Sequence, residues 1–514
     1  MTEEKNRPDS PGIPKEKLRF LEGREILHDK PPETKPRGYF ADAMYRFTRN
    51  RSSVAAAFII LLLVLYAVFV PFFAENPYTR ALKDTMALSY AKLPPKAAFP
   101  LPGFDGETDK TVNAAGYHAL RAIAEETGIN PIVKVYAADR KDTSGSKKTS
   151  YYDLRVDQYA AMGMMSLTLT REEYEALQAW QDKTGIQVIY PAVRDAKQSD
   201  ANIWYEADKK GAPKLDKEGN LVPAWREASP GDTSYHSLRI PRDSDPEHPL
   251  AYARITGTSK APGYVVRVEK NAYFLSRYGF RPAFLFGTND KGQDIFTRLA
   301  HGARFSFLLA IGISAINLLI GAIYGAIEGY YGGAVDLVLE RISDVLSGVP
   351  FMVVTTLFQL HLANKVGVVP ALLFAFVLTG WIGMASLVRM QFYRYKGQEY
   401  ILSARTMGAG DRRIMFGHIF PNAIGTIITG SVLSIPGVIF SESSLTYLGI
   451  INLESSTMTS VGSMLAGGKA YLATDPHIIF FPALFIALLE ISFNLFGNGL
   501  RDAFNPSLRG SEEG

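Results

Sequence analysis

The sequence predicts an α-helical polytopic membrane protein with six transmembrane helices and an extracytoplasmic α+β domain inserted between the first and second spans. Three observations lead to this fold class. Of the 514 residues 47% are apolar, yet the mean hydropathy is +0.00, so apolar and polar stretches must be segregated. Several uncharged apolar runs reach the roughly 20 residues that a helix needs to cross a bilayer. A long polar segment without such a run separates the first apolar run from the next.

The first element is a polar tail, residues 1–51, followed by the first span at residues 52–74. The tail is rich in proline and charged residues and lacks the short apolar core and cleavage site of a signal peptide. Arg46, Arg49 and Arg51 stand directly before the apolar run. Because basic residues that flank a first span tend to stay in the cytoplasm, we expect the N-terminus to lie inside.

The polar segment 75–282 is expected to fold as an extracytoplasmic domain. It carries charges of both signs and three of the four tryptophans, which suits a folded core better than a disordered linker. Residues 171–183 are predicted to form an amphipathic helix, because Thr170 can cap it and Glu172 and Glu173 occupy its first turn. The other expected elements are a helix at 119–126, strands at 187–190 and 263–268, and a hairpin at 202–225 that turns at 217–220.

Both ends of this domain rejoin the membrane. We expect residues 263–280 to form the stalk, since Tyr264, Val266 and Val268 alternate as in a strand. Tyr273 and Phe274 then follow, and aromatic side chains of this kind suit a membrane interface.

Five further apolar runs complete a set of six spans, which places both termini in the cytoplasm. The loop 389–421 supports this orientation, because six lysines or arginines stand there against two acids. The loop 328–344 departs from the rule with four acids and one arginine, but acidic residues weigh little in setting topology. The five runs are residues 305–327, 345–362, 366–388, 422–441 and roughly 477–495.

The composition excludes several kinds of chemistry. The chain has no cysteine, and therefore no disulfide, thiolate metal site or cysteine nucleophile. A formal charge of +4 is small for this length and gives no basis for a nucleic-acid partner. Residues 145–149 and 329–333 contain glycines but lack the spacing of a nucleotide-binding loop. We expect no catalytic residue, metal site or cofactor site in this chain.

The segment 398–422, QEYILSARTMGAGDRRIMFGHIFPN, has too much helical pattern for a simple cytoplasmic connector. Gly408 should break a first helix, and Asp411 is placed to cap a second one by accepting backbone N–H bonds. A helix, a sharp turn and a helix are therefore expected at the cytoplasmic surface. The residues that share one face of the first helix are Tyr400, Ala404 and Met407.

This segment resembles the coupling loop of ABC importer permeases, in which a short helix lies in a groove of the ATPase subunit. Gly408 and the closing residues 421–422 match that loop. The family usually has a Glu-Ala-Ala triplet at residues 402–404, of which only Ala404 is kept, and Glu399 can substitute if the helix rotation allows it. The resemblance assigns ATPase coupling to Glu399, Ala404, Arg405, Gly408, Asp411, Arg412 and Pro421.

Further segments match dipeptide and oligopeptide permeases in the expected order. The resemblance covers residues 52–74 and 285–508, which places a permease domain at 283–508 and leaves a short tail at 509–514. The chain departs from the family pattern at Asn289 and Gln293, where Asp and Arg are usual. The matching segments are 285–298 with 301–304, 329–333 with Asp336, Arg341 and Asp344, 442–449, and 494–506.

The resemblance identifies the chain as similar to the C-type permease of the dipeptide, oligopeptide and nickel importer family. It implies a second permease subunit as heterodimer partner, two ATPase subunits that bind ATP and Mg²⁺, and a solute-binding protein or lipoprotein outside. It also implies a bacterial plasma membrane, the inner membrane where there are two. Peptides are the implied substrate, and nickel, sugars or other solutes of related systems stay open.

Two other functions remain as alternatives. An ion-gradient-driven transporter would use ionisable residues within spans, and Glu490 and His361 are the candidates. We expect Glu490 to face the bundle interior in hydrogen bonds, with a place on the translocation path as the second option. A membrane-anchored external sensor or enzyme is the other alternative. The histidines of the external segment, His118, His236 and His248, have no metal-ligand spacing.

Overall fold

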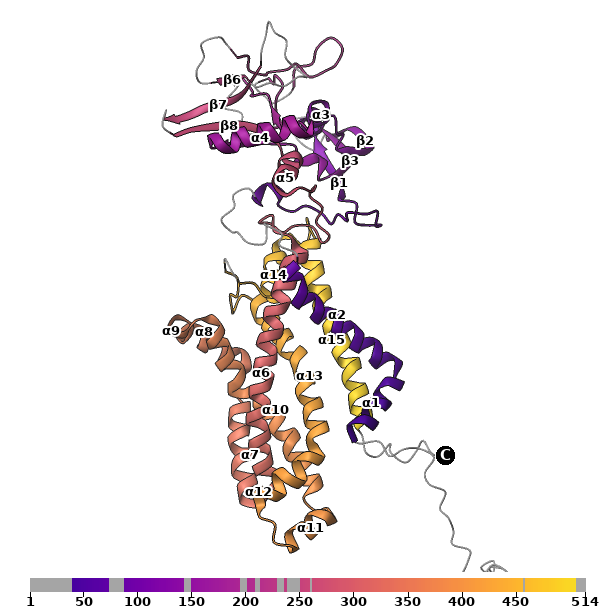
Figure 1. Ribbon diagram of the computed structural model, residues 1–514, viewed down its shortest axis with the longest axis vertical. Helices are drawn as coiled ribbons and strands as arrows, with labels where there is room; N and C mark the ends of the chain where they lie inside the picture. The colour runs from indigo at the N-terminus through magenta and orange to yellow at the C-terminus, as the bar shows by residue number, and fades with distance from the viewer. Residues whose placement is uncertain are drawn as a thin grey trace, which may run out of the picture.

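The computed structural model describes residues 39–73, 87–142, 149–194, 201–208, 213–228, 235–237, 250–258, 261–455 and 458–504. Long helices form one tier, and sheets with shorter helices stack on one end of it (Figure 1). We call residues 39–73 and 295–504 the bundle, and residues 107–278 the head. Most of the predicted tail 1–51 and all of the tail 509–514 lie outside the described residues.

Five helical runs among the described residues are long and apolar enough to cross a membrane. They confirm five of the six predicted spans and begin or end within about a dozen residues of the predicted limits. Each is uncharged over most of its length, which is why composition alone locates it. The runs are α2 (Arg51–Phe73), α6 (Ile295–Tyr331), α10 (Val368–Tyr395), Asp411–Tyr447, which ends in α13 (Phe420–Tyr447), and α15 (His477–Phe504).

The sixth predicted span, residues 345–362, is not a single helix. Helix α7 (Gly333–Ser347) ends there, and α8 (Phe351–His361) and α9 (Ala363–Val366) follow with a change of direction (Figure 1). The break falls at Gly348 and Pro350, where proline lacks the N–H that would continue the helix. A six-span count is therefore not confirmed, since the apolar run is divided between two shorter helices.

Helices α6 and α10 pack together through a stripe of glycines on α6. A Cβ atom at Gly321, Gly325 or Gly329 would come within 3.0 Å of the α10 backbone. At Gly329 the atom would lie 2.7 Å from the carbonyl oxygen of Arg389. Small residues at every fourth position let two helix backbones approach closely in a membrane, where packing replaces the hydrophobic driving force.

The N-terminal part of the described chain packs against its C-terminal part. Helix α1 (Tyr39–Arg49), which falls within the predicted polar tail, places Phe47 beside Ala503. The next helix, α2, is fixed to α15 by a hydrogen bond of 3.0 Å from the Ser53 hydroxyl to the Leu495 carbonyl. The start of α1 and the end of α15 consequently lie at the same end of the bundle, opposite the head (Figure 1).

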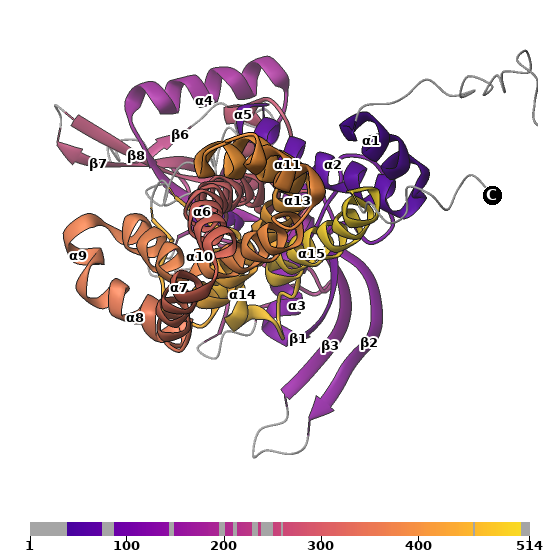
Figure 2. The same ribbon diagram turned by 90° about the horizontal axis from the view of Figure 1, so that it is seen from below.

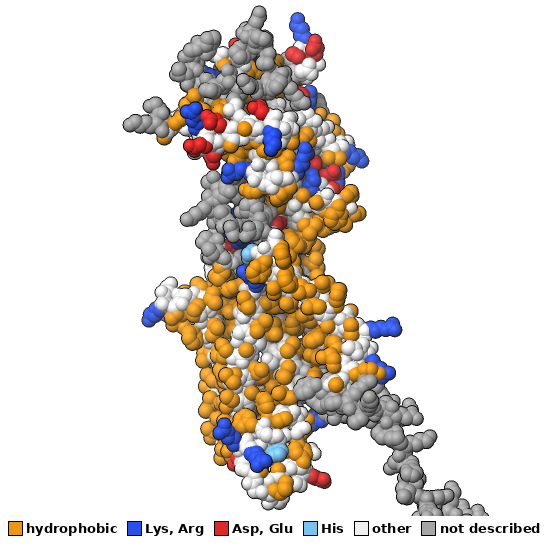
Figure 3. All heavy atoms as spheres, viewed as in Figure 1, with side chains coloured by type: hydrophobic (Ala, Val, Ile, Leu, Met, Phe, Trp, Pro, Cys, Tyr) orange, Lys and Arg blue, Asp and Glu red, His pale blue; other side chains and the backbone are white. Residues whose placement is uncertain are grey.

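The surface changes character between the two tiers. Hydrophobic side chains cover most of the visible bundle, whereas acidic and basic side chains are mixed over the head (Figure 3). Basic side chains reappear at the far end of the bundle (Figure 3). This distribution fits a bilayer around the bundle and water around the head.

The head contains two antiparallel sheets among its described residues. In the first, β3 (Thr149–Asp157) lies between β1 (Glu107–Asn113) and β2 (Ile132–Asp142), and α3 (Ala114–Thr127) packs on the sheet. In the second, β8 (Ala261–Glu269) is central and α4 (Arg171–Thr184) covers the sheet. The remaining strands of the second sheet are β4 (Met164–Leu169), β5 (Ile189–Tyr190), β6 (Tyr235–Ser237) and β7 (Ala251–Thr258).

Local sequence signals in the head are confirmed. The Thr170 hydroxyl and the Glu173 carboxylate form the reciprocal capping box that opens α4. Helix α3 begins at Ala114, earlier than predicted, because the Asn113 side chain caps it. The predicted hairpin turns as expected, with Leu215 paired to Leu221 and a positive φ of 87° at Gly219. Residues 209–212 of that hairpin lie outside the described residues.

A buried ion pair joins the two sheets of the head. The Arg267 guanidinium of β8 bonds both carboxylate oxygens of Glu126 on α3, and the two side chains are only 5% and 4% exposed. Arg267 also donates to the carbonyl oxygens of Ala201 and Pro191. Several donors of one side chain thus hold four segments of the head in place.

Residues 87–96 connect the head to the bundle. The Tyr90 hydroxyl donates to the Lys270 carbonyl at 3.0 Å, and the Leu93 N–H donates to Thr288 at 2.8 Å. The prediction that Tyr273 and Phe274 lie at a membrane interface is wrong, because both side chains are buried in apolar cores. Both belong to α5 (Lys270–Tyr278) and are buried on its apolar face.

Candidate functional site

The segment 398–422 lies at the end of the bundle opposite the head (Figures 1 and 2). Helix α11 (Glu399–Thr406) is followed by a turn in which Gly408 has a positive φ of 84°. The chain continues through α12 (Asp411–Arg413) and a π-helical turn, Ile414–Ile419, directly into α13. The predicted helix, sharp turn and helix are confirmed, because only glycine adopts this backbone angle at low cost.

One face of α11 is fixed to the bundle by apolar contacts. Ile401 is 0% exposed and belongs to one apolar cluster with Ile414, Ile419 and side chains of α6 and α10, and Ala404 is also buried. The three residues predicted to share a face of this helix differ in burial. Ala404 is buried, whereas Tyr400 is exposed and Met407, at the end of α11, is 81% exposed.

Asp411 has a different role from the predicted one. Gly410 is the N-cap of α12 and no side chain caps that helix. The Asp411 carboxylate accepts a hydrogen bond of 2.6 Å from the Tyr330 hydroxyl at the end of α6. Arg405 of α11 donates to the same hydroxyl at 3.4 Å. Tyr330 therefore links α11, α12 and α6, and its place in a matching segment was the one feature of the sequence that pointed to it.

The remaining surface of this segment is both apolar and basic. Glu399 and Leu402 are exposed one helical turn apart, so they lie on neighbouring parts of the α11 surface. Arg412, Phe416 and Gly417 contribute to a shallow hollow beside the turn. Other exposed residues of the segment include Arg405, Met407, Gly408, Asp411, Arg413 and Pro421.

The acidic loop that departs from the charge rule is neutralised within the fold. Arg389 of α10 binds Asp336 of α7 through two bonds of 2.6 and 2.9 Å and Glu340 through two bonds of 2.9 and 3.0 Å. The Tyr393 hydroxyl also donates to Asp336, at 2.6 Å. One basic residue of 389–421 thus pairs with two acids of 328–344, so the charges of the two loops do not act independently.

Glu490 borders a wide, mostly apolar cavity of about 700 Å³ between α13, α15 and the short helix α14 (Val461–Gly468). The carboxylate is half-buried, and within the described part of the chain no hydrogen bond or ion pair reaches it. The hydrogen bonds predicted for it in the bundle interior are therefore not seen. The other intramembrane candidate, His361, is exposed at the end of α8.

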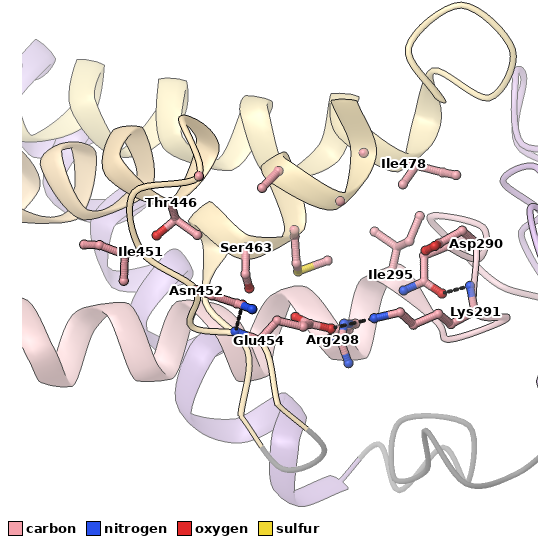
Figure 4. Close-up of a pocket in the computed structure, with 16 residues that line it drawn as sticks. Asp290, Lys291, Ile295, Arg298, Thr446, Ile451, Asn452, Glu454, Ser463 and Ile478 are labelled. Atoms are coloured by element: carbon pink, nitrogen blue, oxygen red, sulfur yellow. Dashed lines mark hydrogen bonds and ion pairs between the residues drawn. The ribbon is translucent and has the colours of Figure 1, made fainter. Parts of the chain in front are cut away.

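A second, more enclosed pocket of about 360 Å³ lies near the head end of the bundle, between α6, residues 449–454 and α14. Figure 4 shows Lys291 and Arg298 converging on Glu454 at one end of it. Lys291 Nζ is 3.2 Å from the Glu454 carboxylate, and Arg298 donates to the same oxygen. The sequence placed Lys291 and Arg298 in a matching segment, but nothing in it indicated Glu454 as their partner.

A buried carboxylate lies next to this pocket. Glu442 of α13 accepts hydrogen bonds from the hydroxyls of Ser306 at 3.0 Å, Ser460 at 2.7 Å and Thr446 at 3.2 Å. Its donors come from α6, from the N-cap of α14 and from α13 itself. Glu442 therefore fixes the start of α14 to two helices of the bundle.

Comparisons with known proteins find two families whose patterns match parts of the chain that include the bundle helices. The family described as "Binding-protein-dependent transport system inner membrane component" matches residues 317–510, and "N-terminal TM domain of oligopeptide transport permease C" matches residues 38–95. The oligopeptide transport system permease protein OppC of Bacillus subtilis is 41% identical over 224 residues, 44% of this chain and 72% of that protein. The chain belongs to the OppC/DppC-like family of ABC transport permeases.

Other members of the family give the same result. The dipeptide transport system permease protein DppC of Bacillus subtilis is 39% identical, over 44% of this chain and 69% of that protein. The OppC protein of Haemophilus influenzae is 38% identical, over 44% and 70%. A solved structure of the MetNI methionine ABC transporter in an inward-facing conformation matches 40% of this chain and 96% of that one. The identity is 13% and the TM-score 0.33, which is too low to support an argument.

Membership decides between the functions that the sequence left open. As an ABC permease the chain is a transport subunit and not an enzyme, and ATP hydrolysis belongs to separate ATPase subunits. Neither a secondary transporter nor an anchored enzyme or sensor agrees with this family. The two matching family regions leave the head, residues 107–278, outside the family pattern.

Proposed function

We propose that this permease is the C-type subunit of a bacterial peptide importer and that it couples to a separate ATPase through residues 398–422. The names of its relatives, oligopeptide and dipeptide permeases, support the substrate class. The arrangement of α11 supports the coupling role. The side of α11 that carries Ile401 and Ala404 is buried against the bundle. Leu402, Met407 and Arg405 remain exposed at the end opposite the head. A force on this surface would reach α6, α10 and α13 directly.

The proposed topology has six crossings, with both termini in the cytoplasm of a cell whose plasma membrane holds the bundle. Helices α7 and α8 together would supply the crossing that neither makes alone. The described ends of the chain lie at the end of the bundle that carries α11, and this supports an even number of crossings. The head then lies outside as an inserted α+β domain, residues 75–282 in the predicted division.

The proposed assembly contains a second permease subunit, two ATPase subunits that bind ATP and Mg²⁺, and an external solute-binding protein or lipoprotein. ATP can shift the bundle between inward-open and outward-open states only if it binds one arrangement of the ATPases better than the other. The coupling residues would transmit that difference. Glu399 would take the contacts of the missing family glutamate, and Arg405, Arg412 and Pro421 would meet the ATPase groove. Glu490, at the open cavity beside α14, is the proposed contributor to the translocation path.

The head is proposed to dock the binding protein or the partner permease at the mouth of the path. Its buried cores and its junction through Tyr90 and Leu93 support a fixed position there. Replacing residues 107–278 by a short polar linker, while keeping residues 87–106, tests the idea. Loss of uptake with intact ATPase assembly is expected. Unchanged uptake and unchanged binding-protein affinity would leave only a stabilising role.

Gly408→Val tests the coupling role. The left-handed angle at Gly408 costs an L-residue roughly 1–2 kcal/mol, and an added Cβ would meet no other atom, so only the turn is strained. Peptide uptake and its coupling to ATP hydrolysis should fall while the bundle still inserts. Gly410→Val is the matched control, because Gly410 has a φ of −71° and equally open space. Normal uptake by the Gly408 variant, or ATP hydrolysis by the purified chain alone, would refute the proposal.

A further inference from the structure

The enclosed pocket at the head end of the bundle combines an apolar body with one charged end. Its volume of about 360 Å³ falls at the lower limit of ligand pockets, which span roughly 300–1,000 Å³. Small residues of α14 keep one wall open, since Ala466, Gly467 and Gly468 project little into it. The apolar side chains that form the body are Ile295, Ile451, Met464 and Ile478 (Figure 4).

The charged end of the pocket carries two basic side chains, Lys291 and Arg298, and two acidic ones, Asp290 and Glu454, and among the described residues the Arg298 guanidinium is hydrogen-bonded to Glu454 alone. Glu454 is shared by Arg298 and Lys291, which bond to the same carboxylate oxygen. The Arg298 side chain is 8% exposed, although a guanidinium can donate five hydrogen bonds and this one is seen with a single acceptor side chain. A buried arginine with one monodentate carboxylate is well suited to accept a second carboxylate in the bidentate geometry that guanidinium groups prefer.

Glu454 is also the point at which the pocket connects to α14. Its second oxygen accepts a hydrogen bond from the Thr459 hydroxyl at 3.2 Å, and Thr459 lies 3.0 Å from the Ser463 hydroxyl. Ser463 and Ser460 cap α14 reciprocally, and Ser460 donates to the buried Glu442. A ligand that draws Arg298 away from Glu454 would therefore act on the segment that holds α14 against α6 and α13.

We propose that this pocket binds the free carboxylate end of a short peptide, with Arg298 and Lys291 on the carboxylate and Glu454 as the internal competitor for Arg298. The apolar body would take the C-terminal side chain. The inference rests on the proposed function for its substrate class, and it assigns a binding step to the permease itself at the end where the peptide arrives. Glu454 is displaced from Arg298 on binding, and no covalent change is involved.

The absence of cysteine in the chain allows a direct test in the assembled importer. Ala466→Cys places one thiol on the pocket wall, outside the hydrogen-bonded network. The probes are the dipeptide Ala-Leu with free ends and the same dipeptide as its C-terminal amide. Ala-Leu should slow the labelling of the thiol by a small maleimide, and the amide should need an at least tenfold higher concentration, because the charge-assisted bonds are lost. Equal protection by both probes overturns the proposal.

Two variants are expected to act in opposite directions. Arg298→Gln should raise the concentration of Ala-Leu needed for protection at least tenfold, whereas Glu454→Gln should lower it, because the internal competitor loses its charge. A purely structural ion pair would weaken protection, or leave it unchanged, in both variants. Arg341→Gln, which removes an exposed arginine of α7, is the control and should change nothing. If Arg298→Gln does not assemble, the direction seen with Glu454→Gln decides alone.

Uptake of Ala-Leu into vesicles separates this inference from the function on which it rests. Uptake of Ala-Leu by the Ala466→Cys importer without protection of its thiol would overturn the pocket and leave peptide transport standing. Protection without any ATP-dependent uptake of Ala-Leu or longer peptides would overturn peptide transport and leave a carboxylate pocket. Protection together with uptake, with opposite responses of the two variants, supports both.

Discussion

Glycine has opposite uses in the bundle and in the head. In the bundle, Gly321, Gly325 and Gly329 provide space, because the backbone of α10 occupies the position of a side chain. In the head, Gly128 and Gly185 provide a backbone angle, with φ of 72° and 70° and nothing within 4 Å of an added Cβ. A membrane bundle is thus held by the closeness of its helices, whereas the head is held by side-chain cores whose connections need special turns.

The two regions also bury charge differently. The head buries a complete ion pair, in which Arg267 meets Glu126 and two backbone carbonyls. The bundle buries the Glu442 carboxylate under hydroxyl groups only. Removing a partner of the buried group costs stability in both regions, but removing Glu126 in the head leaves the charge of Arg267 without a countercharge. The following predictions test this contrast, beginning with the largest effect.

The two regions should differ completely in access from outside the cell. Lys217→Cys lies at the hairpin of the head and Ser403→Cys on α11, at opposite ends of the molecule. An impermeant thiol reagent applied to intact cells should label only the first, and opening the cells should expose the second. Labelling of both in intact cells would contradict six crossings with the head outside.

Gly325→Val should destroy the bundle. A Cβ there overlaps the carbonyl group of Ala385, which is backbone and cannot move aside, so the overpacking penalty should reach or exceed roughly 1–3 kcal/mol. Gly312→Val, on the same helix but with nothing within 4 Å, is the control and should cost little beyond helix propensity. Thermal denaturation of both purified variants in detergent checks the difference. Similar melting temperatures would show that close α6–α10 packing is not required.

Glu126→Gln should destabilise the head and leave the bundle intact. The change leaves Arg267 buried without a countercharge, and breaking such a pair costs about 3–5 kcal/mol. Trp180, Trp204 and Trp225 report on the head by fluorescence once the bundle tryptophan is removed by Trp381→Phe. Glu175→Gln, which breaks an exposed pair with Arg171, should leave the midpoint of urea unfolding almost unchanged. Equal effects of the two variants would refute a special role for the buried pair.

Gly185→Ala should have a smaller effect in the head, about 1 kcal/mol, because alanine must adopt the left-handed angle that ends α4. The same substitution at Gly383, in the middle of α10 with open space around it, should be neutral or stabilising in the bundle. The unfolding midpoint should therefore fall for Gly185→Ala and stay the same or rise for Gly383→Ala. A stabilised Gly185→Ala head would show that the turn does not depend on that angle.

The sequence predicted best what depends on local pattern. Five spans follow from apolar runs, and α4 follows from Thr170, Glu173 and the glycine after it. The break of α7 at Gly348 and Pro350 was missed, because an apolar run does not reveal a change in helix direction. The buried partnership of Arg267 and Glu126, 141 residues apart, has no local signal at all.

The same limit applies to the candidate sites. Helical spacing located α11 and its turn, but it did not indicate which side of the helix is buried, and the structure buries Ile401 and Ala404. Rotation of a short surface helix is fixed by what it packs against, and α11 packs on the π-helical turn Ile414–Ile419. Asp411 was expected at a helix cap, and the hydroxyl that it binds belongs to Tyr330, 81 residues away. Long-range polar partners of this kind come only from the fold.

The smallest effect should be a pH dependence of the head that arises from Glu269. This carboxyl group caps α5 by accepting the N–H groups of Asn271 and Ala272, and burial raises its pKa above the ordinary value despite these bonds. The folded head then binds a proton more readily than the unfolded chain. The contribution of Glu269 to the stability of the head is complete below the ordinary carboxyl pKa and is lost as the pH rises through the raised pKa.

Glu269→Gln isolates this contribution, because the amide oxygen can still accept both N–H bonds but no longer titrates. The difference in head stability between the unsubstituted chain and the variant should fall between the ordinary and the raised carboxyl pKa and stay constant at higher pH. Other carboxyl groups of the head, such as Asp216, whose pKa is lowered chiefly by a backbone hydrogen bond from Asn220, oppose the trend, but they contribute equally to both proteins and cancel in the difference. Urea unfolding followed by head tryptophan fluorescence at several pH values measures it. A difference that rises with pH would mean that the two N–H bonds outweigh burial, so that Glu269 is an ordinary helix cap.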